Sequence, residues 1–322
     1  MKKNSLRVAA IQFQSVNRDV EANIRRASEY IQRAAEEKAE LVLLPEFSTT
    51  GYELNERLWE FAEPREGITT RWLKEQAKKH RIWIGASYLE AEGSDFYNSF
   101  VLVNPSGNEV GRVWKETAGS VETYLFKGRE SDHIIETEIG RIGVIICYDG
   151  IMSAPLRRLA DASPDIILLP HSAAYPSRIP ILFPQSAVDF LMAYMRNNAA
   201  RIAKMFGVPA ILSNKTGAWI SEMVKPYPAQ NGGFMGCSAI ADSNGKILVQ
   251  AGDEETTLVA EVDVSGSFKP ETIDTQFFGQ WSVKVPWHFK WWPIVESKGK
   301  NYYATSTIRQ EKAQATSTAR QS

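Results

Sequence analysis

The chain has 322 residues, of which 43% are hydrophobic, and its 37 Lys and Arg nearly balance its 38 Asp and Glu. This hydrophobic content excludes disorder over most of the length and is ample for one large domain with a full core. The net charge of -1 gives no electrostatic basis for binding nucleic acid or an anionic membrane, so neither is predicted as a partner.

Secretion, membrane insertion and cofactor binding have no signal in the sequence. The first apolar run covers only residues 8–11, too short for a signal peptide, and no stretch approaches the roughly 20 apolar residues of a membrane span. The two cysteines, Cys147 and Cys237, make neither a disulfide framework nor a zinc knuckle. We therefore expect a reducing, cytoplasmic location and no metal. Glycine-rich nucleotide-binding motifs are missing, so no cofactor is predicted.

The first half of the chain alternates apolar strands with amphipathic segments. Residues 7–13 (RVAAIQF) predict a strand. Residues 20–39 predict a helix, because Ile24, Ala27 and Ile31 fall on one face and charged residues fill the other. The remaining elements predicted here are a strand at 40–46, a helix at 68–80, a strand at 81–90, and a strand pair within 96–116 that turns at 104–108.

The second half repeats this order of elements. It predicts a strand at 141–149, a helix at 154–162, a strand at 165–173, a long helix at about 184–206, a strand at 208–217 and a strand pair within 236–252. Strands this apolar must be covered on both faces. The predicted fold class is therefore α/β, a four-layer α-β-β-α sandwich of two stacked mixed sheets flanked by helices.

The composition changes at about residue 265. The segment 277–295 is rich in proline and aromatic residues, including Trp281, Trp287, Trp291 and Trp292. A stable monomer is not expected to expose so many tryptophans. We predict a main domain at 1–264 and an extension at 265–322 that lies at an interface between copies of the chain. An extension that wraps its own domain is the alternative, and residues 303–322 are expected to fray.

Three chemically useful side chains each follow an apolar strand. Glu46 follows LVLLP, Lys115 follows RVW, and Cys147 follows GVII. Each has an ordinary explanation on its own, since a cysteine at a strand end is often a small packing residue. Strand ends converge on one site in open α/β architectures, however, so we predict that the three side chains form one catalytic set.

An acid, an ammonium and a thiol suit attack on a carbonyl or nitrile carbon. The thiol must lose its proton to react, and a carboxylate in a desolvated pocket can accept it. Lys115 and the backbone N–H of Tyr148 can meet the charge that develops, each contributing about 3 kcal/mol in comparable sites. His171 and Ser172, in LLPHSA, are predicted to face the substrate. A pair of Cys147 with His171 is the alternative reading.

Three segments, LVLLPEFSTTGY, RVWKETAGSVETYLFKG and GVIICYDG, resemble in order the motif regions of the nitrilase superfamily of carbon-nitrogen hydrolases. The segments SNKTG and FMGCSAIADSNGKIL resemble two supporting motifs, and the resemblance spans residues 7 to about 264. It implies that Glu46 is the general base, Lys115 the oxyanion stabiliser and Cys147 the nucleophile.

The resemblance also implies a second glutamate near the site, ahead of an aromatic pair and a glycine. Glu122, in ETYLFKG, has that context, whereas Glu116 does not. The chain departs from the family just after the nucleophile, where Met152, Ser153 and Ala154 replace the usual Phe-Pro-Glu. A later Arg-Ala-x-Glu-Asn pattern is replaced in the region of ARIAKMFG. These departures leave the catalytic set intact, and they leave the identity of the substrate open.

The segment CYDG resembles the amidase and carbamoylase branches more than the nitrilase branch, which has Trp-Glu after the cysteine. The resemblance implies a thiol hydrolase that cleaves a non-peptide C–N bond of a small amide or N-carbamoyl compound. The reaction would pass through a Cys147 thioester and release ammonia or an amine. A nitrilase acting on a nitrile and a non-catalytic scaffold are the alternatives. The family also implies a homodimer or larger homo-oligomer with exchanged C-terminal segments.

Overall fold

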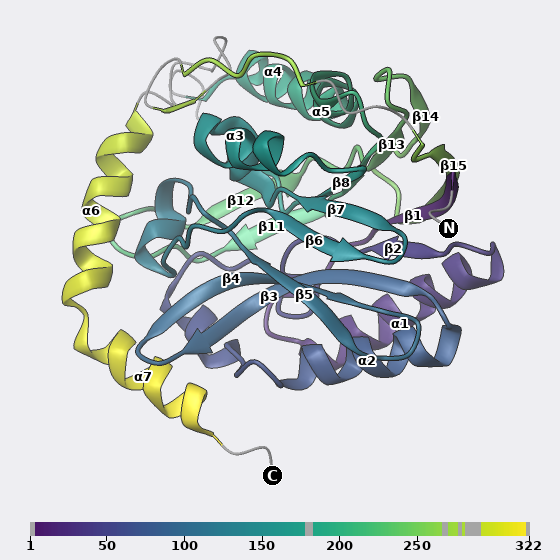
Figure 1. Ribbon diagram of the computed structural model, residues 1–322. Coiled ribbons are helices and arrows are strands. Elements are labelled where there is room, and N and C mark those ends of the chain that lie inside the picture. The colour runs from purple at the N-terminus through teal and green to yellow at the C-terminus, as the bar shows by residue number, and fades with distance from the viewer. Residues whose placement is uncertain (1–3, 178–182, 266–269, 276–278, 281–290, 320–322) are drawn as a thin grey trace.

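The computed structural model describes residues 4–177, 183–265, 270–275, 279–280 and 291–319. Two six-stranded sheets stack on one another, and helices cover their outer faces (Figure 1). Both sheets contain parallel and antiparallel pairs. The predicted α/β class with four α-β-β-α layers and two mixed sheets is therefore confirmed.

The first sheet has the strand order β15-β1-β2-β3-β4-β5, with β1, β2 and β3 parallel and the remaining pairs antiparallel. β15 was not among the predicted elements, yet it pairs with β1 along its whole length. Most of its side chains are only half-buried, and its sequence TTLVAEVD accordingly lacks the regular alternation of apolar and polar residues that predicts a strand. The strands are Ser5–Gln12 (β1), Leu41–Leu43 (β2), Trp83–Glu92 (β3), Asp95–Val103 (β4), Glu109–Trp114 (β5) and Thr256–Asp263 (β15).

The second sheet has the order β14-β13-β10-β8-β7-β6, with β10, β8 and β7 parallel. Its strands are Ile134–Thr137 (β6), Gly140–Val144 (β7), Ile166–Pro170 (β8), Ala210–Ser213 (β10), Ala239–Ala241 (β13) and Ile247–Gln250 (β14). A third, small sheet that was not predicted contains Ala174–Tyr175 (β9), Ala218–Ser221 (β11) and Gln230–Phe234 (β12). This small sheet contributes to the wall of the cavity described below.

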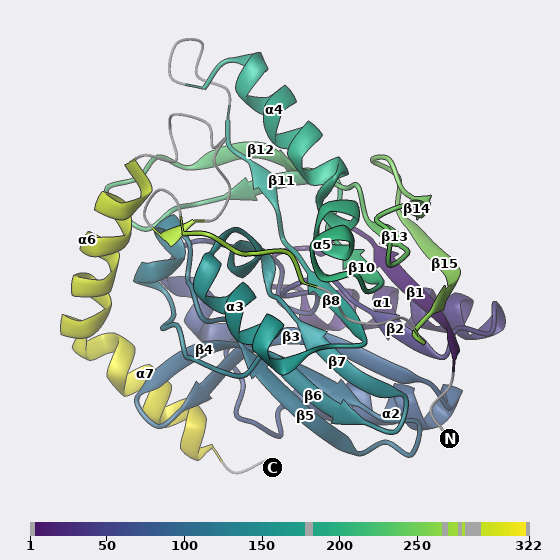
Figure 2. The ribbon, with the colours of Figure 1, turned by 45° about the horizontal axis from the view of Figure 1, so that its top comes forward.

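Helices α1 and α2 cover the first sheet, and α3, α4 and α5 cover the second (Figures 1 and 2). The side chain of Asp19 caps α1 by accepting a hydrogen bond from the N–H of Ala22, and the helix buries Ala27 and Ile31. Another apolar core fills the space between the sheets. The helices are Val20–Glu36 (α1), Ile68–His80 (α2), Ser153–Ala162 (α3), Gln185–Arg196 (α4) and Asn198–Phe206 (α5).

The helix predicted over 184–206 is broken at Asn197, which separates α4 from α5. The backbone of Asn197 leaves the helical region (φ -98, ψ 2), and its side chain donates a 2.9 Å hydrogen bond to the carbonyl of Ala193. Asparagine competes for backbone groups in this way, and the amphipathic pattern carries no sign of it. The two helices consequently follow different directions over the second sheet (Figure 2).

Helices α6 (Trp292–Thr305) and α7 (Thr307–Thr318) run down one side of the molecule (Figures 1 and 2). The expectation that residues 303–322 fray is wrong for most of that segment. Tyr303 and Ala313 are buried against the main body of the protein. The described part of the extension therefore wraps its own chain, which was the alternative reading.

Exposed apolar side chains occur along this segment: Trp291 directly before α6, Ile294 on α6 and Ile308 on α7. Of the other tryptophans singled out in the sequence, Trp292 lies at the start of α6, whereas Trp281 and Trp287 lie outside the described residues. The division into a domain at 1–264 and an extension thus stays a prediction.

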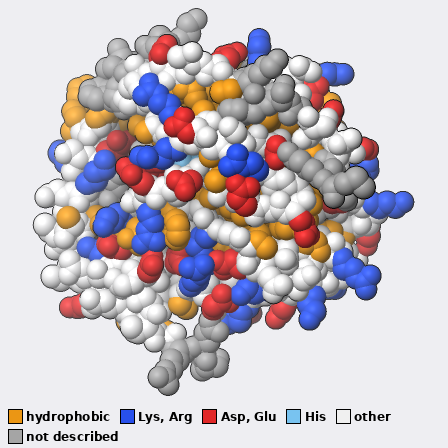
Figure 3. Space-filling model, in the orientation of Figure 1, with side chains coloured by type: hydrophobic (Ala, Val, Ile, Leu, Met, Phe, Trp, Pro, Cys, Tyr) orange, Lys and Arg blue, Asp and Glu red, His pale blue; other side chains and the backbone are white. Residues whose placement is uncertain are grey.

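The charged side chains are spread over the surface. On the face seen in Figure 3, basic and acidic side chains are intermixed rather than gathered into a patch of one sign. This agrees with the near balance of the two charges in the sequence. In the part of the chain that the structure describes, no helix is both long and apolar enough to cross a bilayer.

Candidate active site

The ends of three strands from the two large sheets meet at one cavity. Glu46 lies shortly after β2, Lys115 directly follows β5, and Cys147 follows β7 and begins a 3-10 turn, η3 (Cys147–Ile151). The Nζ atom of Lys115 lies 2.9 Å from Oε1 of Glu46. Lys115 and Cys147 line the same cavity. The three side chains of the predicted catalytic set are thus brought together.

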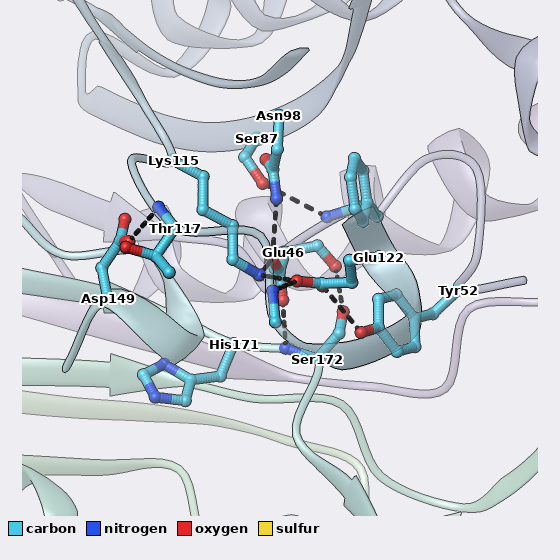
Figure 4. Close-up of polar contacts among 12 residues, drawn as sticks. Glu46, Tyr52, Ser87, Asn98, Lys115, Thr117, Glu122, Asp149, His171 and Ser172 are labelled. Carbon is cyan, nitrogen blue, oxygen red and sulfur yellow. Dashed lines mark hydrogen bonds and ion pairs between the residues drawn. The ribbon is translucent and has the colours of Figure 1, made fainter. Parts of the chain in front are cut away.

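Glu46 is fully buried, and its carboxylate is held on both oxygens (Figure 4). The side-chain amide of Asn98 donates to Oε1 at 2.7 Å, and the backbone N–H of Ser172 donates to Oε2 at 2.9 Å. A carboxylate offers about four lone-pair sites. Since Lys115, Asn98 and Ser172 use three of them, one site on Oε2 remains to accept a proton.

Glu122 lies on the other side of the ammonium, in a short 3-10 helix, η2 (Ser120–Tyr124). Its Oε1 accepts hydrogen bonds from Lys115 and from the hydroxyl of Tyr52, both at 2.8 Å (Figure 4). Its Oε2 accepts from the backbone N–H of Gly119 at 2.7 Å. The ammonium is therefore fixed between two buried carboxylates.

A second polar network lies behind the nucleophile turn. The buried carboxylate of Asp149 accepts hydrogen bonds from the backbone N–H groups of Glu116 at 3.0 Å and Thr117 at 2.7 Å, and so ties η3 to the segment that follows Lys115. The side chain of Glu116 contacts His133 at 3.1 Å and does not point at Lys115. The sequence context that preferred Glu122 thus agrees with the geometry.

The charges of the catalytic cluster depend on one another. Burial alone would lower the pKa of Lys115, but the neighbouring Glu122 and Glu46 outweigh it and hold that pKa well above its ordinary value. Burial raises the pKa of the Cys147 thiol far above its usual range; Glu46 adds to the rise, and Lys115 opposes it. The raised pKa favours the thiol form of Cys147, which would need a base to take its proton before it could react as a nucleophile.

The backbone at the nucleophile is strained. Cys147 has φ 48, in the left-handed region that residues other than glycine rarely adopt. Tyr148 follows it in the same turn, where its hydroxyl accepts a 3.2 Å hydrogen bond from Gln280 and its ring packs against Trp292. These two contacts of its side chain hold Tyr148 in place, and with it the backbone N–H of this residue.

His171 lines the cavity, but both of its ring nitrogens are engaged. Nδ1 lies 3.1 Å from the carbonyl of Leu169, and Nε2 accepts from the side-chain amide of Asn198 at 3.1 Å. Burial lowers the pKa of His171 to about 4, so the ring is neutral near pH 7. No nitrogen is left to take a proton from Cys147. Nor do the described residues include any group of three or more His, Cys, Asp or Glu that could hold a metal ion.

The residues that depart from the family pattern after the nucleophile contact the C-terminal segment. Met152 forms an isolated β-bridge with Gln280, and the hydroxyl of Ser153 donates to the carbonyl of Gly279 at 2.8 Å. Of the residues described along the cavity, none is Met152, Ser153 or Ala154. The sequence left the effect of these three residues open, and the structure places Met152 and Ser153 against the C-terminal segment rather than along the cavity.

Sequence reasoning missed three residues of the site. Tyr52 binds Glu122 and Asn98 binds Glu46, and Lys215 is fully buried with its Nζ 2.9 Å from the carbonyl of Phe47. Burial lowers the pKa of Lys215 to about 7. Only Asn98 had a signal in the sequence, because it is a polar residue inside an apolar strand. The roles of Tyr52 and Lys215 depend on contacts with residues that are distant in the sequence.

A family model described as carbon-nitrogen hydrolase matches residues 7–267, most of the chain. The chain belongs to this family. Among relatives of this carbon-nitrogen hydrolase, a nitrilase of Pyrococcus abyssi is 28% identical over 264 residues, covering 80% of this chain and 90% of the relative. An N-carbamoylputrescine amidase of Solanum lycopersicum is 27% identical over 273 residues, covering 82% of this chain and 88% of the relative.

Solved structures share the fold of this carbon-nitrogen hydrolase. A carbon-nitrogen hydrolase from Helicobacter pylori G27 superposes with a TM-score of 0.70 at 20% identity, covering 81% of this chain and 90% of that one. Nit3 of Saccharomyces cerevisiae, a member of the nitrilase superfamily, gives a TM-score of 0.65 at 23% identity, covering 81% and 91%. The predicted membership in the nitrilase superfamily is confirmed, and the chain is an enzyme of the carbon-nitrogen hydrolase class.

Proposed function

We propose that the enzyme cleaves a non-peptide C–N bond of a small amide or N-carbamoyl compound through a thioester on Cys147. Ammonia or an amine is the first product, and a carboxylic or carbamic acid is the second. The proposal is supported chiefly by the Lys115 ammonium, which is held between Glu46 and Glu122 beside the thiol. The amidases among the relatives support the same reaction class.

In the first half of the reaction, Sγ of Cys147 attacks the carbonyl carbon while its proton moves to Oε2 of Glu46, the oxygen with a free lone-pair site. The carbonyl π electrons move to oxygen, where the Lys115 ammonium and the backbone N–H of Tyr148 stabilise the negative charge. The tetrahedral intermediate then collapses. Its C–N bond breaks, the nitrogen takes the proton from Glu46, and ammonia or an amine leaves.

In the second half, water replaces the departed amine. Glu46 accepts a proton from the water as its oxygen attacks the thioester carbon, and the same two donors stabilise the second oxyanion. The C–S bond then breaks, and the thiolate of Cys147 takes the proton back from Glu46. The acid leaves, and every group of the cluster returns to its starting state.

Ammonia release tests this proposal. Cys147→Ala should lower release from a cleaved amide at least a thousandfold, because it removes the covalent route. Cys237→Ala is the matched control, since Cys237 is a buried packing residue in the core of the second sheet. A rate of ammonia release by the Cys147→Ala variant equal to that of the parent protein would contradict the proposal.

A nitrile substrate is a second candidate, favoured by the relative described as a nitrilase. The same cluster would stabilise charge on nitrogen, and the acid would form after addition of two waters. A scaffold without catalysis is less well supported, because an open cavity of about 330 Å³ lies beside the cluster. Screening amides, N-carbamoyl compounds and nitriles for ammonia release separates the three readings.

We also propose a homodimer or larger homo-oligomer in the cytoplasm. The exposed side chains of Trp291, which precedes α6, Ile294 on α6 and Ile308 on α7 support a second copy of the chain as their cover. Sedimentation should give a mass above that of one chain, and Ile294→Lys should lower it. A monomer at micromolar concentration would contradict the proposal. The proposed location is supported by the free thiols of Cys147 and Cys237, which a reducing compartment keeps reduced.

A further inference from the structure

The cavity beside Cys147 has a polar end and a large apolar remainder. Lys115, Glu122 and Cys147 form the polar end. The remainder comes mainly from α4, from β11 and the segment after it, and from the start of α6. Its apolar members include Leu191, Met195, Trp219, Met223, Tyr227 and Trp292.

Among the described residues that line this cavity, charged residue types lie only at the end near Cys147. Among the lining residues that the structure describes, Lys115 is the one lysine or arginine and Glu122 the one acidic residue, and their side chains bind each other at 2.8 Å. His171 also lines the cavity, and its ring is neutral near pH 7 because burial lowers its pKa to about 4. A substrate carboxylate or ammonium placed among the apolar side chains would lose its water without gaining a counter-charge, which is strongly unfavourable.

The apolar wall combines fixed rings with adaptable side chains. The rings of Tyr52 and Trp219 lie 6.1 Å apart, and the indole N–H of Trp219 donates to the carbonyl of Tyr52 at 3.0 Å. Met195 and Met223 are unbranched and can adjust to the shape of a bound group. Such a lining accommodates a phenyl ring or an aliphatic chain in the part of the substrate that does not react.

We propose that the preferred substrates are amides whose acyl group is uncharged and apolar, ending in a phenyl ring or an aliphatic chain. This specificity rests on the proposed function, because it assumes that the scissile carbonyl lies at Cys147 and that the acyl group fills the remaining cavity. The relatives include amidases of several substrate classes. The cavity favours the neutral class over amides with a terminal carboxylate or ammonium.

Four primary amides of similar length test the specificity. Hexanamide and 3-phenylpropanamide are neutral, adipamate carries a terminal carboxylate, and 6-aminohexanamide carries a terminal ammonium. We expect kcat/KM for both neutral amides to exceed that for both charged ones by at least tenfold, the scale on which apolar pockets discriminate. Equal or higher kcat/KM for either charged amide would overturn the proposal.

A charge placed in the apolar wall should change this preference. Met223→Lys supplies a counter-charge and is expected to raise the adipamate-to-hexanamide ratio of kcat/KM at least tenfold. Glu222→Lys is the control, because Glu222 is the exposed neighbour of Met223 and does not line the cavity. The same change of ratio in both variants would show that general surface charge, rather than the cavity, sets the preference.

Binding to the Cys147→Ala variant separates this inference from the proposed function. The variant keeps the cavity and cannot form a thioester, so tryptophan fluorescence should report tighter binding of 3-phenylpropanamide than of adipamate. If no amide is cleaved but this preference holds, the proposed function fails and the specificity stands. If cleavage depends on Cys147 but charged amides bind equally well, the specificity fails and the function stands.

Discussion

At the scale of single residues, the site is built around the Lys115 ammonium. A buried cation is unfavourable alone, and so is a buried carboxylate, because each gives up its hydration. Glu46 and Glu122 contact Lys115 at 2.9 and 2.8 Å, and the two carboxylates also accept hydrogen bonds from the neutral donors Asn98 and Gly119. The cluster therefore keeps its charges in the interior and orients the donor that an oxyanion needs.

Replacing Glu122 tests whether its charge orients Lys115. Glu122→Gln keeps the shape of the side chain but removes its negative charge. It also replaces one of the two acceptor oxygens, which now bind Lys115, Tyr52 and the N–H of Gly119, by an NH2 group. We expect kcat/KM to fall about 10- to 100-fold because small misplacements of a catalytic group have effects of this size. The measurement is amide turnover, with folding checked by circular dichroism.

Glu116→Gln is the matched control for this prediction. The carboxylate of Glu116 binds His133 and Arg158, each at 3.1 Å, so its loss should affect activity less. If the Glu116 variant lost more activity than the Glu122 variant, the second glutamate of the site would have been assigned to the wrong residue.

The sequence predicted the principal site residues better than it predicted their supports. Glu46, Lys115 and Cys147 stand out because each breaks an apolar run at a strand end. Asn98 shows its role only when β4 lies beside the residue that it binds, 52 positions away. Lys215 gives no sign of burial in the sequence, since a lysine in a turn is ordinarily solvated.

At the scale of elements, short turns place the catalytic atoms. η3 holds Cys147, η2 holds Glu122, and Asp149 ties the first of these turns to the segment that leads toward the second. Hydrophobic periodicity and composition predicted most of the long strands and helices, but not β15, α6 or α7. They did not predict the 3-10 turns, because runs this short have no repeating apolar face.

The packing of α6 against η2 can be tested at Gly299. A Cβ at this position would lie 2.0 Å from Oγ1 of Thr123 and 2.6 Å from the ring of Tyr124, so Gly299→Ala forces η2 to move. We expect a loss of about 1–3 kcal/mol of unfolding free energy from this overpacking. Amide turnover should also fall, because Glu122 lies in η2.

Ser297→Ala provides the comparison for Gly299→Ala, since Ser297 is exposed on the same helix. Urea unfolding and amide turnover of the Ser297 variant should match those of the parent protein. Parent-like values for the Gly299 variant as well would mean that α6 does not press on η2 in solution.

At the scale of the whole molecule, the two halves of the chain build two similar layers. Each half contributes a six-stranded sheet with helices on its outer face, apart from β15, which returns to pair with β1. The repeated order of elements made the stacked fold predictable. The course of the C-terminal helices was not, because their contacts with the main domain join residues far apart in the sequence, such as Phe96 and the Tyr303 hydroxyl, which are 207 positions apart.

The titration of the buried Glu63, which lies just before α2, should make the stability of the protein depend on pH. The N–H of Thr69 donates to its carboxylate at 2.7 Å, which favours the ionised form, but burial dominates and raises its pKa to about 7. The unfolded chain ionises near pH 4.3. Between these values the folded state holds the extra proton, so this group's contribution to the unfolding free energy declines as pH rises toward 7.

Glu63→Gln mimics the protonated form and does not titrate. The unfolding free energy of the variant, relative to the parent protein, should therefore increase by on the order of 2 kcal/mol between pH 5 and pH 8. Urea unfolding of both proteins at the two pH values measures this difference. A difference that is the same at pH 5 and pH 8 would contradict the raised pKa.

The thioester on Cys147 is the central claim, and intact-mass spectrometry tests it most directly. An activated ester, p-nitrophenyl 3-phenylpropanoate, should acylate the enzyme faster than water removes the acyl group. After acid quenching, the parent protein and Cys237→Ala are predicted to carry one phenylpropanoyl group, on the peptide that contains Cys147, and Cys147→Ala to carry none. An adduct of equal yield on Cys147→Ala, or no adduct on the parent protein during turnover, would contradict the account.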